Sequence, residues 1–196
     1  MGIRDSLRPV PLSVTAIGGD DLVDKDMGDM NEVASYVPNL DVLAVPTFPS
    51  IYMRGLGSSY NRGFEQSVAI LIDEVFYGRA SYINQGLLDL QSVEVLRGPQ
   101  GTLFGRNTPA GIVKIDTVKP GDEFAVDGSV SYGSFNSISA DGGVTLPLAP
   151  GVVSLRLSGL WQQRDNWVDN GFTGEEDAYG AYSEVAGRAQ LLITPG

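Results

Sequence analysis

Apolar and polar positions follow different periods in the two halves of this chain. Between residues 124 and 193 the pattern predicts strands that each have one apolar face and one face of small, polar or charged residues. They are Phe124–Tyr132, Ile138–Leu146, Val153–Trp161 and Val185–Ile193. Each segment is about ten residues long and alternates with the period of a β-strand. A short turn at 133–137, a tight turn at 147–151 and a long acidic loop at 163–184 connect them. The pattern predicts an antiparallel sheet whose apolar face turns either to a protein core or to lipid.

The first half mixes short strands and helices. We expect strands at Pro11–Ile17, Asp41–Val45, Tyr52–Arg54, Val68–Val75, Val93–Leu96 and Ile112–Ile115. We expect helices from Leu22, over Asp29–Tyr36 and over Ile83–Leu90, with Asp20 or Asp21 as the N-cap of the first. The period changes near Pro120, so the prediction is an α+β domain over 8–120 and a strand domain over 121–196.

Composition excludes several kinds of chemistry. The 196 residues contain no cysteine and no histidine, which removes thiolate and imidazole catalysis and the common zinc sites. The net charge of -11 disfavours a nucleic-acid binder. The segment Asp24–Asp29 begins faintly like a calcium loop, but its glycine comes one place early and Ser35 stands where glutamate is needed. We expect no cofactor and no metal.

The stretch VEVLRGPQGTLFGRN, Val93–Asn107, raises the question of a phosphate loop. Its glycines, Gly98, Gly101 and Gly105, match neither the Walker spacing nor the dinucleotide pattern, and Pro99 lacks a backbone N–H. Glycines between two strands more often serve tight turns. Arg54 and Arg97 each end a strand directly before a glycine, and they need acidic partners if they are enclosed. Alternatively, they are ordinary surface residues of turns.

Several motifs, in order along the chain, resemble the plug domain of TonB-dependent outer-membrane receptors. They are Val10–Ile17, Val37–Leu40, Tyr52–Gly55, Ile72–Phe76 with Gly78 and Arg79, and the most specific block, Val93–Pro120. The resemblance covers about residues 8–194, because the later strands look like the first strands of the barrel in that family. Asn39 and Glu74 stand where the family often has glycine.

The resemblance implies an α+β plug domain followed by antiparallel strands of an incomplete transmembrane β-barrel. It implies import of a scarce nutrient across the Gram-negative outer membrane, with siderophore-bound iron as the first class and haem, cobalamin or oligosaccharide as others. The plug would gate the barrel lumen. Partners would be the TonB energy-transducing complex, outer-membrane lipid and a small-molecule ligand, with no nucleic acid and no enzymatic activity.

The resemblance also assigns roles to residues. The plug–barrel lock would use Arg54, Arg97 and Glu94, with the arginines pairing with barrel glutamates. Structural glycines would be Gly55, Gly98, Gly101, Gly105 and Gly111. The ligand-facing plug loops would present Tyr52, Ser58, Tyr60, Asn61, Arg62, Tyr77 and Arg79.

Two alternatives to an importer stay open at this point. One is a transport-inactive, plug-like protein with a regulatory or scaffold role, and the other is a soluble α+β enzyme, for which the sequence offers no nucleophile–base pair. About four strands cannot close a barrel, and no signal peptide or TonB box is visible before Arg8. We therefore expect the chain to be a fragment of a longer receptor.

Overall fold

The fold is described by a computed structural model for residues 13–25, 27–43, 50–57, 67–78, 87–101 and 108–194. Contacts between residues divide the chain into two compact units, 1–117 and 118–196. Within the described ranges, no helix combines the length and the apolar character that crossing a membrane requires.

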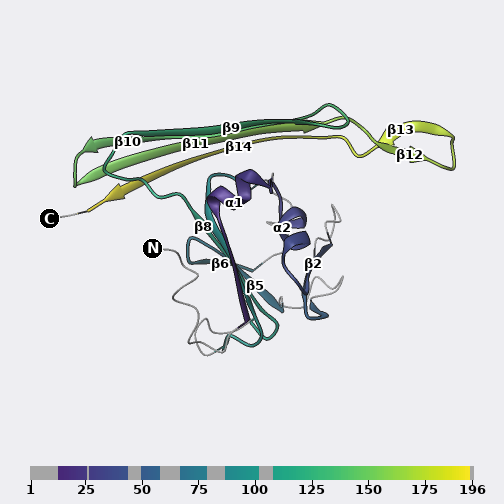
Figure 1. The fold of residues 1–196 in the computed structure, drawn as a ribbon, viewed down its shortest axis with the longest axis horizontal. Coiled ribbons are helices and arrows are strands. Elements are labelled where there is room, and N and C mark those ends of the chain that lie inside the picture. Colours follow the sequence, from purple (N-terminus) through teal and green to yellow (C-terminus); the bar gives the residue numbers. More distant parts are fainter. Residues whose placement is uncertain are drawn as a thin grey trace. The chain divides into compact units, whose positions relative to one another are not determined.

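A five-stranded sheet forms the centre of the first unit. Its order is β1 (Ser13–Gly18), β7 (Leu90–Arg97), β8 (Gly111–Thr117), β5 (Val68–Ile72) and β6 (Val75–Tyr77). The strands β5 and β8 run parallel, and the other neighbouring pairs run antiparallel. The short helices α1 (Gly19–Asp24) and α2 (Met30–Tyr36) lie on one side of this sheet (Figure 1).

The core of the first unit follows from alternation along the strands. Every second residue of the central strands points to the helices, so Val93, Val95 and Val113 are fully buried there. They pack with Met30 and Val33 of α2 in one cluster. On the opposite face Ala69, Leu71 and Ile112 form a smaller cluster with Leu96. Both faces of the central strands are therefore apolar, as the run at 68–72 predicts.

Tight turns with positive φ shape the rest of the first unit. A second sheet, β2 (Leu40–Leu43), β3 (Ser50–Met53) and β4 (Leu56–Gly57), turns at Arg54 and Gly55, with φ of 53° and 77°. Asn39 and Glu74, the two positions where the resembling family often has glycine, have φ of 62° and 67°. The backbone conformation that glycine favours is thus kept by other residues at both turns.

Three details of the first unit differ from the sequence predictions. Helix α1 begins at Gly19 after the N-cap Gly18, which makes no side-chain cap; Asp20 and Asp21 lie in the first turn, where carboxylates favour the helix dipole. The strand predicted over Val68–Val75 breaks at a turn after Ile72. Of the helix predicted over Ile83–Leu90, residues 83–86 lie outside the described ranges, residues 87–89 are not helical and Leu90 begins β7. By contrast, α2 is confirmed and begins with a capping box of Asp29 and Glu32.

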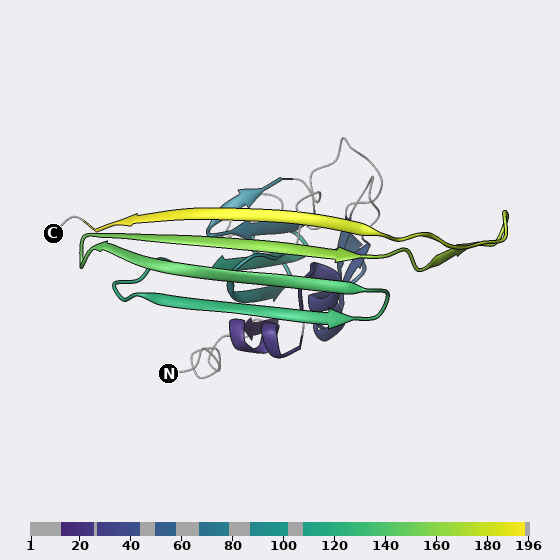
Figure 2. The same ribbon diagram turned by 90° about the horizontal axis from the view of Figure 1, so that it is seen from above.

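The second unit is a sheet of long antiparallel strands. Figure 2 shows them side by side in the order β14 (Tyr182–Ile193), β11 (Val153–Arg164), β10 (Ser137–Ala149) and β9 (Ala125–Gly133). These strands coincide with the four predicted segments, and β10, β11 and β14 are some residues longer than predicted. The predicted loop at 163–184 contains a further hairpin, β12 (Val168–Asn170) and β13 (Glu175–Tyr179), which continues beyond the ends of β11 and β14 (Figure 2).

In this long sheet the apolar face is exposed and the polar face is buried, the reverse of the arrangement usual in soluble proteins. Cross-strand partners place the predicted apolar positions on one face, for example Val126, Val144, Leu157 and Ala189 in one row. On this apolar face Val130 is 80% exposed and Val185 is 77% exposed. On the opposite, polar face Ser154 is 2% exposed and Arg156 is 1% exposed. The predicted assignment of faces is confirmed, and the polar face is the buried one.

Candidate functional site

Two arginines of the predicted lock gather at one end of the first unit. The Arg97 guanidinium donates from Nη2 to Thr15 Oγ1 at 2.7 Å, from Nη1 to the Pro38 carbonyl at 2.9 Å and from Nε to the Ser13 carbonyl at 3.4 Å. A side chain added at Gly98 would start 3.7 Å from Arg54 Nη1, which places the Arg54 guanidinium beside the residue that follows Arg97. These acceptors are neutral, and within the described ranges no carboxylate pairs with either arginine.

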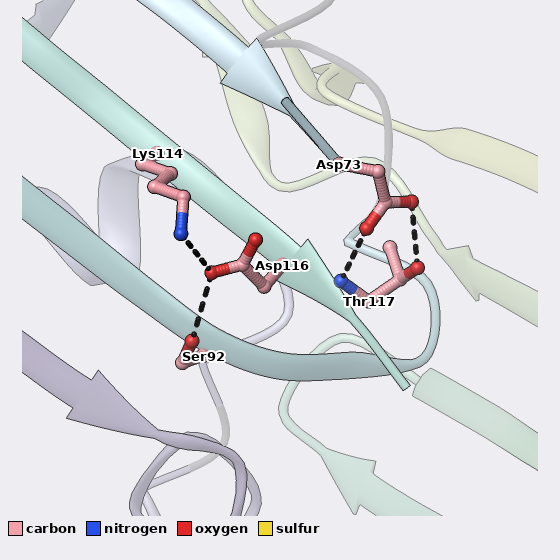
Figure 3. Close-up of polar contacts among 5 residues, drawn as sticks. All are labelled: Asp73, Ser92, Lys114, Asp116 and Thr117. Atoms are coloured by element: carbon pink, nitrogen blue, oxygen red, sulfur yellow. Dashed lines mark hydrogen bonds and ion pairs between the residues drawn. The ribbon is translucent and has the colours of Figure 1, made fainter. Parts of the chain in front are cut away.

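Glu94 lies apart from these arginines. It is three residues before Arg97 on β7, so it points to the opposite face of the sheet, where its partner across β8 is Lys114. The Lys114 ammonium contacts Asp116 Oδ2 at 2.8 Å, and Ser92 Oγ lies 3.5 Å from the same oxygen (Figure 3). The hydrogen bond to Asp116 raises the pKa of Lys114; partial burial opposes this, and the charges of Asp116, Glu94 and Glu74 add to it.

A carboxylate clamp closes the end of β8. The backbone N–H of Thr117 donates to Asp73 Oδ1 at 3.0 Å, and its hydroxyl donates to Asp73 Oδ2 at 2.7 Å (Figure 3). Thr117 is fully buried and is the last residue of the first unit. Sequence reasoning missed this contact between Asp73 and Thr117, because the parallel register between β5 and β8 cannot be read from either strand alone.

The predicted structural glycines occupy different environments. At Gly111 φ is 150°, and an added Cβ would overlap both Met53 Sδ and the Leu96 carbonyl oxygen, so the backbone approach requires glycine there. Gly55 and Gly98 also have positive φ. At Gly101 the nearest atom to an added Cβ would be Thr108 Oγ1 at 3.9 Å, which is ordinary contact. Gly105 lies outside the described ranges.

Most of the predicted ligand-facing residues fall on segments that the structure does not describe. They are Ser58, Tyr60, Asn61, Arg62 and Arg79. Tyr52 is half-buried on β3, where its ring packs against the backbone position of Gly57. Tyr77 is also half-buried and packs against the main core cluster. A role of these residues in binding a ligand stays a prediction.

The polar face of the long sheet holds a buried arginine that sequence reasoning missed. Arg156 Nη2 contacts both carboxylate oxygens of Asp127, at 2.9 and 3.0 Å, and Nη1 donates to Thr145 Oγ1 at 2.9 Å. The guanidinium crosses Gly143, where an added Cβ would overlap Nη2 and lie 2.8 Å from Cζ. The alternation places these residues on one face, but the register that joins three strands comes only from the structure.

Comparison with known proteins decides the family. The family described as TonB-dependent Receptor Plug Domain matches residues 6–112. The chain belongs to this family. The predicted resemblance is confirmed, and the family consists of outer-membrane receptors of Gram-negative bacteria.

Relatives extend the likeness beyond the plug. The pesticin receptor of Yersinia pestis is 29% identical over 188 residues, which are 94% of this chain and 27% of that protein. The iron-regulated outer membrane virulence protein of Vibrio cholerae is 26% identical over 190 residues, covering 87% of this chain and 28% of that protein. The chain therefore spans less than a third of the length of these curated relatives.

A solved structure confirms the fold class. The ferric yersiniabactin uptake receptor FyuA from Yersinia pestis superposes with a TM-score of 0.78 at 27% identity, covering 94% of this chain and 29% of that receptor. A match of 94% of the chain reaches well beyond Thr117 into the long strands. An α+β plug followed by antiparallel strands of an incomplete barrel is thus the architecture of this chain.

Proposed function

We propose that this chain is the plug and the first barrel strands of a transporter that imports a ferric siderophore across the outer membrane with energy from the TonB complex. The observation that carries the proposal is the reversed sheet of residues 125–193, whose apolar face is exposed and whose polar face is buried. Soluble proteins rarely expose a continuous apolar surface of this extent. A strand of a transmembrane barrel has this arrangement because its outer face meets hydrocarbon.

The ends of the strands support the same assignment. Tyr132 and Trp161 lie on the apolar face near one end of the sheet and remain 73% and 40% exposed. Aromatic side chains of this kind favour the boundary between lipid and water, since one edge of the ring system is apolar and the other is polar. The hairpin β12–β13 then continues beyond that boundary, on the side of the longer connection.

Siderophore-bound iron is the cargo that the relatives favour. The relatives include a ferric yersiniabactin uptake receptor and an iron-regulated outer membrane protein, at 27% and 26% identity. The catecholate siderophore receptor Fiu of Escherichia coli is 32% identical over 75 residues, or 38% of this chain. These names support a ferric siderophore over haem, cobalamin or an oligosaccharide.

The gathered guanidinium groups support a lock between plug and barrel. Arg54 and Arg97 bring two positive charges to one end of the plug, and the described partners of Arg97 are neutral oxygens. In this chain Arg54 is exposed and Arg97 is half-buried, and a barrel that encloses both charges would have to supply acidic partners, which are the barrel glutamates of the proposed lock. Glu94, which faces Lys114 on the other side of the sheet, would stabilise the plug internally.

The test is to express the complete gene in cells that lack other siderophore receptors. Uptake of radioactive iron is measured with phenolate, catecholate and hydroxamate chelates, and with cobalamin and haem as competitors. Saturable, TonB-dependent uptake of one ferric chelate is the expected result. Iron uptake equal to that of cells without the gene would contradict the proposal.

The lock is tested separately in the same cells. Arg97→Ala should admit a large hydrophilic antibiotic that the intact outer membrane excludes, while Lys25→Ala, at an exposed cation of the plug, should not. An Arg97→Ala receptor that is inserted at the normal level and stays tight would remove this role.

A further inference from the structure

One cationic side chain at the end of the polar face pairs with no carboxylate among the described residues. Arg164 is the last residue of β11 and lies opposite Tyr182 of β14. Its distance of eight residues from Arg156 places both on the same polar face of the sheet. The Arg164 guanidinium lies 5.6 Å from the ring centre of Trp167 and 5.0 Å from that of Tyr182. Two aromatic rings therefore hold it in place.

The nearby carboxylates have other partners. Glu184 Oε2 accepts a hydrogen bond from Gln162 Nε2 at 2.8 Å, and Asp165 Oδ2 accepts one from Asn136 Nδ2 at 2.7 Å. In the part of the chain that the structure describes, Arg164 forms no ion pair, and its Nε is buried without a hydrogen-bond partner. The charge of Arg164 is therefore not neutralised within the described part of the chain, so it can pair with an anion from outside.

The residues around Arg164 are held in place by hydrogen bonds and ring contacts. The carbonyl of Phe135 accepts from the backbone N–H of Asp165 at 2.9 Å, and the ring centres of Phe135 and Trp167 lie 6.2 Å apart. Phe135 holds φ of 59°, a conformation that costs energy for a side chain of this size. The backbone N–H of Trp167 donates to the Tyr179 carbonyl at 2.9 Å, and the indole ring packs against Gly180. The turn β9–β10 and the base of the hairpin thus form one rigid support.

We propose that Arg164, between Trp167 and Tyr182, binds an anionic oxygen of the imported ferric chelate and selects for negatively charged chelates over neutral ones. This rests on the proposed function, because the polar face is the face that lines the lumen of a barrel. A guanidinium between two rings can still donate from its terminal N–H groups, and these match a phenolate, catecholate or carboxylate oxygen with charge-assisted hydrogen bonds. Trp167 and Tyr182 are both partly exposed, and aromatic side chains favour an aromatic ligand by stacking.

The test compares two ligands on the complete receptor in detergent. The probes are an anionic ferric tris-catecholate complex and an uncharged ferric tris-hydroxamate complex, and the readout is quenching of tryptophan fluorescence, to which this chain contributes Trp161 and Trp167. Arg164→Gln should weaken binding of the anionic complex at least about tenfold and leave the affinity for the uncharged complex, where it binds, within about twofold. Arg164→Lys keeps the charge and loses the planar, two-pronged donor group, so its affinity for the anionic complex should lie between those of the unsubstituted receptor and Arg164→Gln. Arg188→Gln removes a charge from the same face and should leave the ratio of the two affinities unchanged.

The outcomes distinguish a failure of the Arg164 site from a failure of the proposed import function. Loss of the anionic complex alone supports the assignment, since a folding defect would weaken both ligands equally. Equal weakening of both, or no change for the anionic complex, overturns the role of Arg164 and leaves the importer intact. Failure of the unsubstituted receptor to bind any ferric chelate contradicts the proposed function, and the assignment of Arg164 fails with it.

Discussion

The plug and the long sheet obey the same alternation of side chains but bury opposite faces. In the plug, β7 and β8 turn Val93, Val95 and Val113 inward and leave no contact of these residues with solvent. In the long sheet, residues of the same type, such as Val126, Val130 and Val185, are more than two-thirds exposed, and Arg156 is buried. An alternation of apolar and polar residues therefore indicates that the two faces of a strand meet different environments. It does not indicate which of these environments is water.

The largest effect should come from placing a charge on each apolar face. Val95→Lys puts an unpaired ammonium into the plug core and should abolish amide protection across β7 and β8, a loss of about 4 kcal/mol or more. In lipid vesicles, Val130→Lys should lower the free energy of unfolding by about 2–4 kcal/mol. Ser131→Lys, one residue later on the polar face, should cost less than about 1 kcal/mol. Equal costs at positions 130 and 131 would break the comparison.

A slightly smaller effect is expected at glycines where the backbone packs closely. Gly111→Ala in the plug combines positive φ with overlap onto Met53 and the Leu96 carbonyl, and should cost about 3 kcal/mol. Gly187→Ala in the long sheet meets its nearest atom at 3.8 Å and should change the free energy of unfolding by less than about 1 kcal/mol. Urea unfolding of the two variants measures the difference. A tolerated Gly111→Ala would show that the plug backbone can separate at this point.

A third change tests the buried arginine of the polar face. Gly143→Ala forces the Arg156 guanidinium away from Asp127 and should destabilise the sheet by about 1–3 kcal/mol. Its matched control is Gly159→Ala on the apolar face of the neighbouring strand, where the nearest atom lies at 4.0 Å. The temperature at which the compact form is lost on a gel measures the stability of both variants. Identical midpoints would mean that the arginine yields without cost.

Much of the fold was predictable because it depends on local pattern. The strands of the long sheet, the two faces and α2 follow from alternation and from the capping residues Asp29 and Glu32. The clamp of Asp73 on Thr117, the pair of Arg156 and Asp127 and the ring stack around Arg164 were not predictable from the sequence. Apart from the contact between Arg164 and Trp167, each joins residues far apart in the chain, and a shift of one residue in register would separate them. The hairpin β12–β13 was missed because its strands are short and acidic.

The smallest effect concerns pH and is confined to the plug. The pKa of Lys114 is raised above its ordinary value of 10.5, so the ammonium stabilises the fold fully below that pH and loses its contribution as the pH rises through the folded pKa. Lys114→Met should therefore be less stable than the unsubstituted protein at neutral pH, and the difference in melting temperature should shrink above pH 10.5. A difference that stays constant across this range would assign the effect to packing of the side-chain stem.

The most direct test of the central claim is a scan of β9 with single spin labels in the complete receptor in lipid vesicles. This chain contains no cysteine, so each substitution adds one defined labelling site to it. Labels at positions 126, 128, 130 and 132 should collide often with oxygen dissolved in lipid and rarely with a water-soluble nickel chelate. Labels at 127, 129 and 131 should lack this lipid signature. A uniform signal along β9, or an alternation of the opposite phase, would contradict the claim that the exposed apolar face of this sheet is its lipid face.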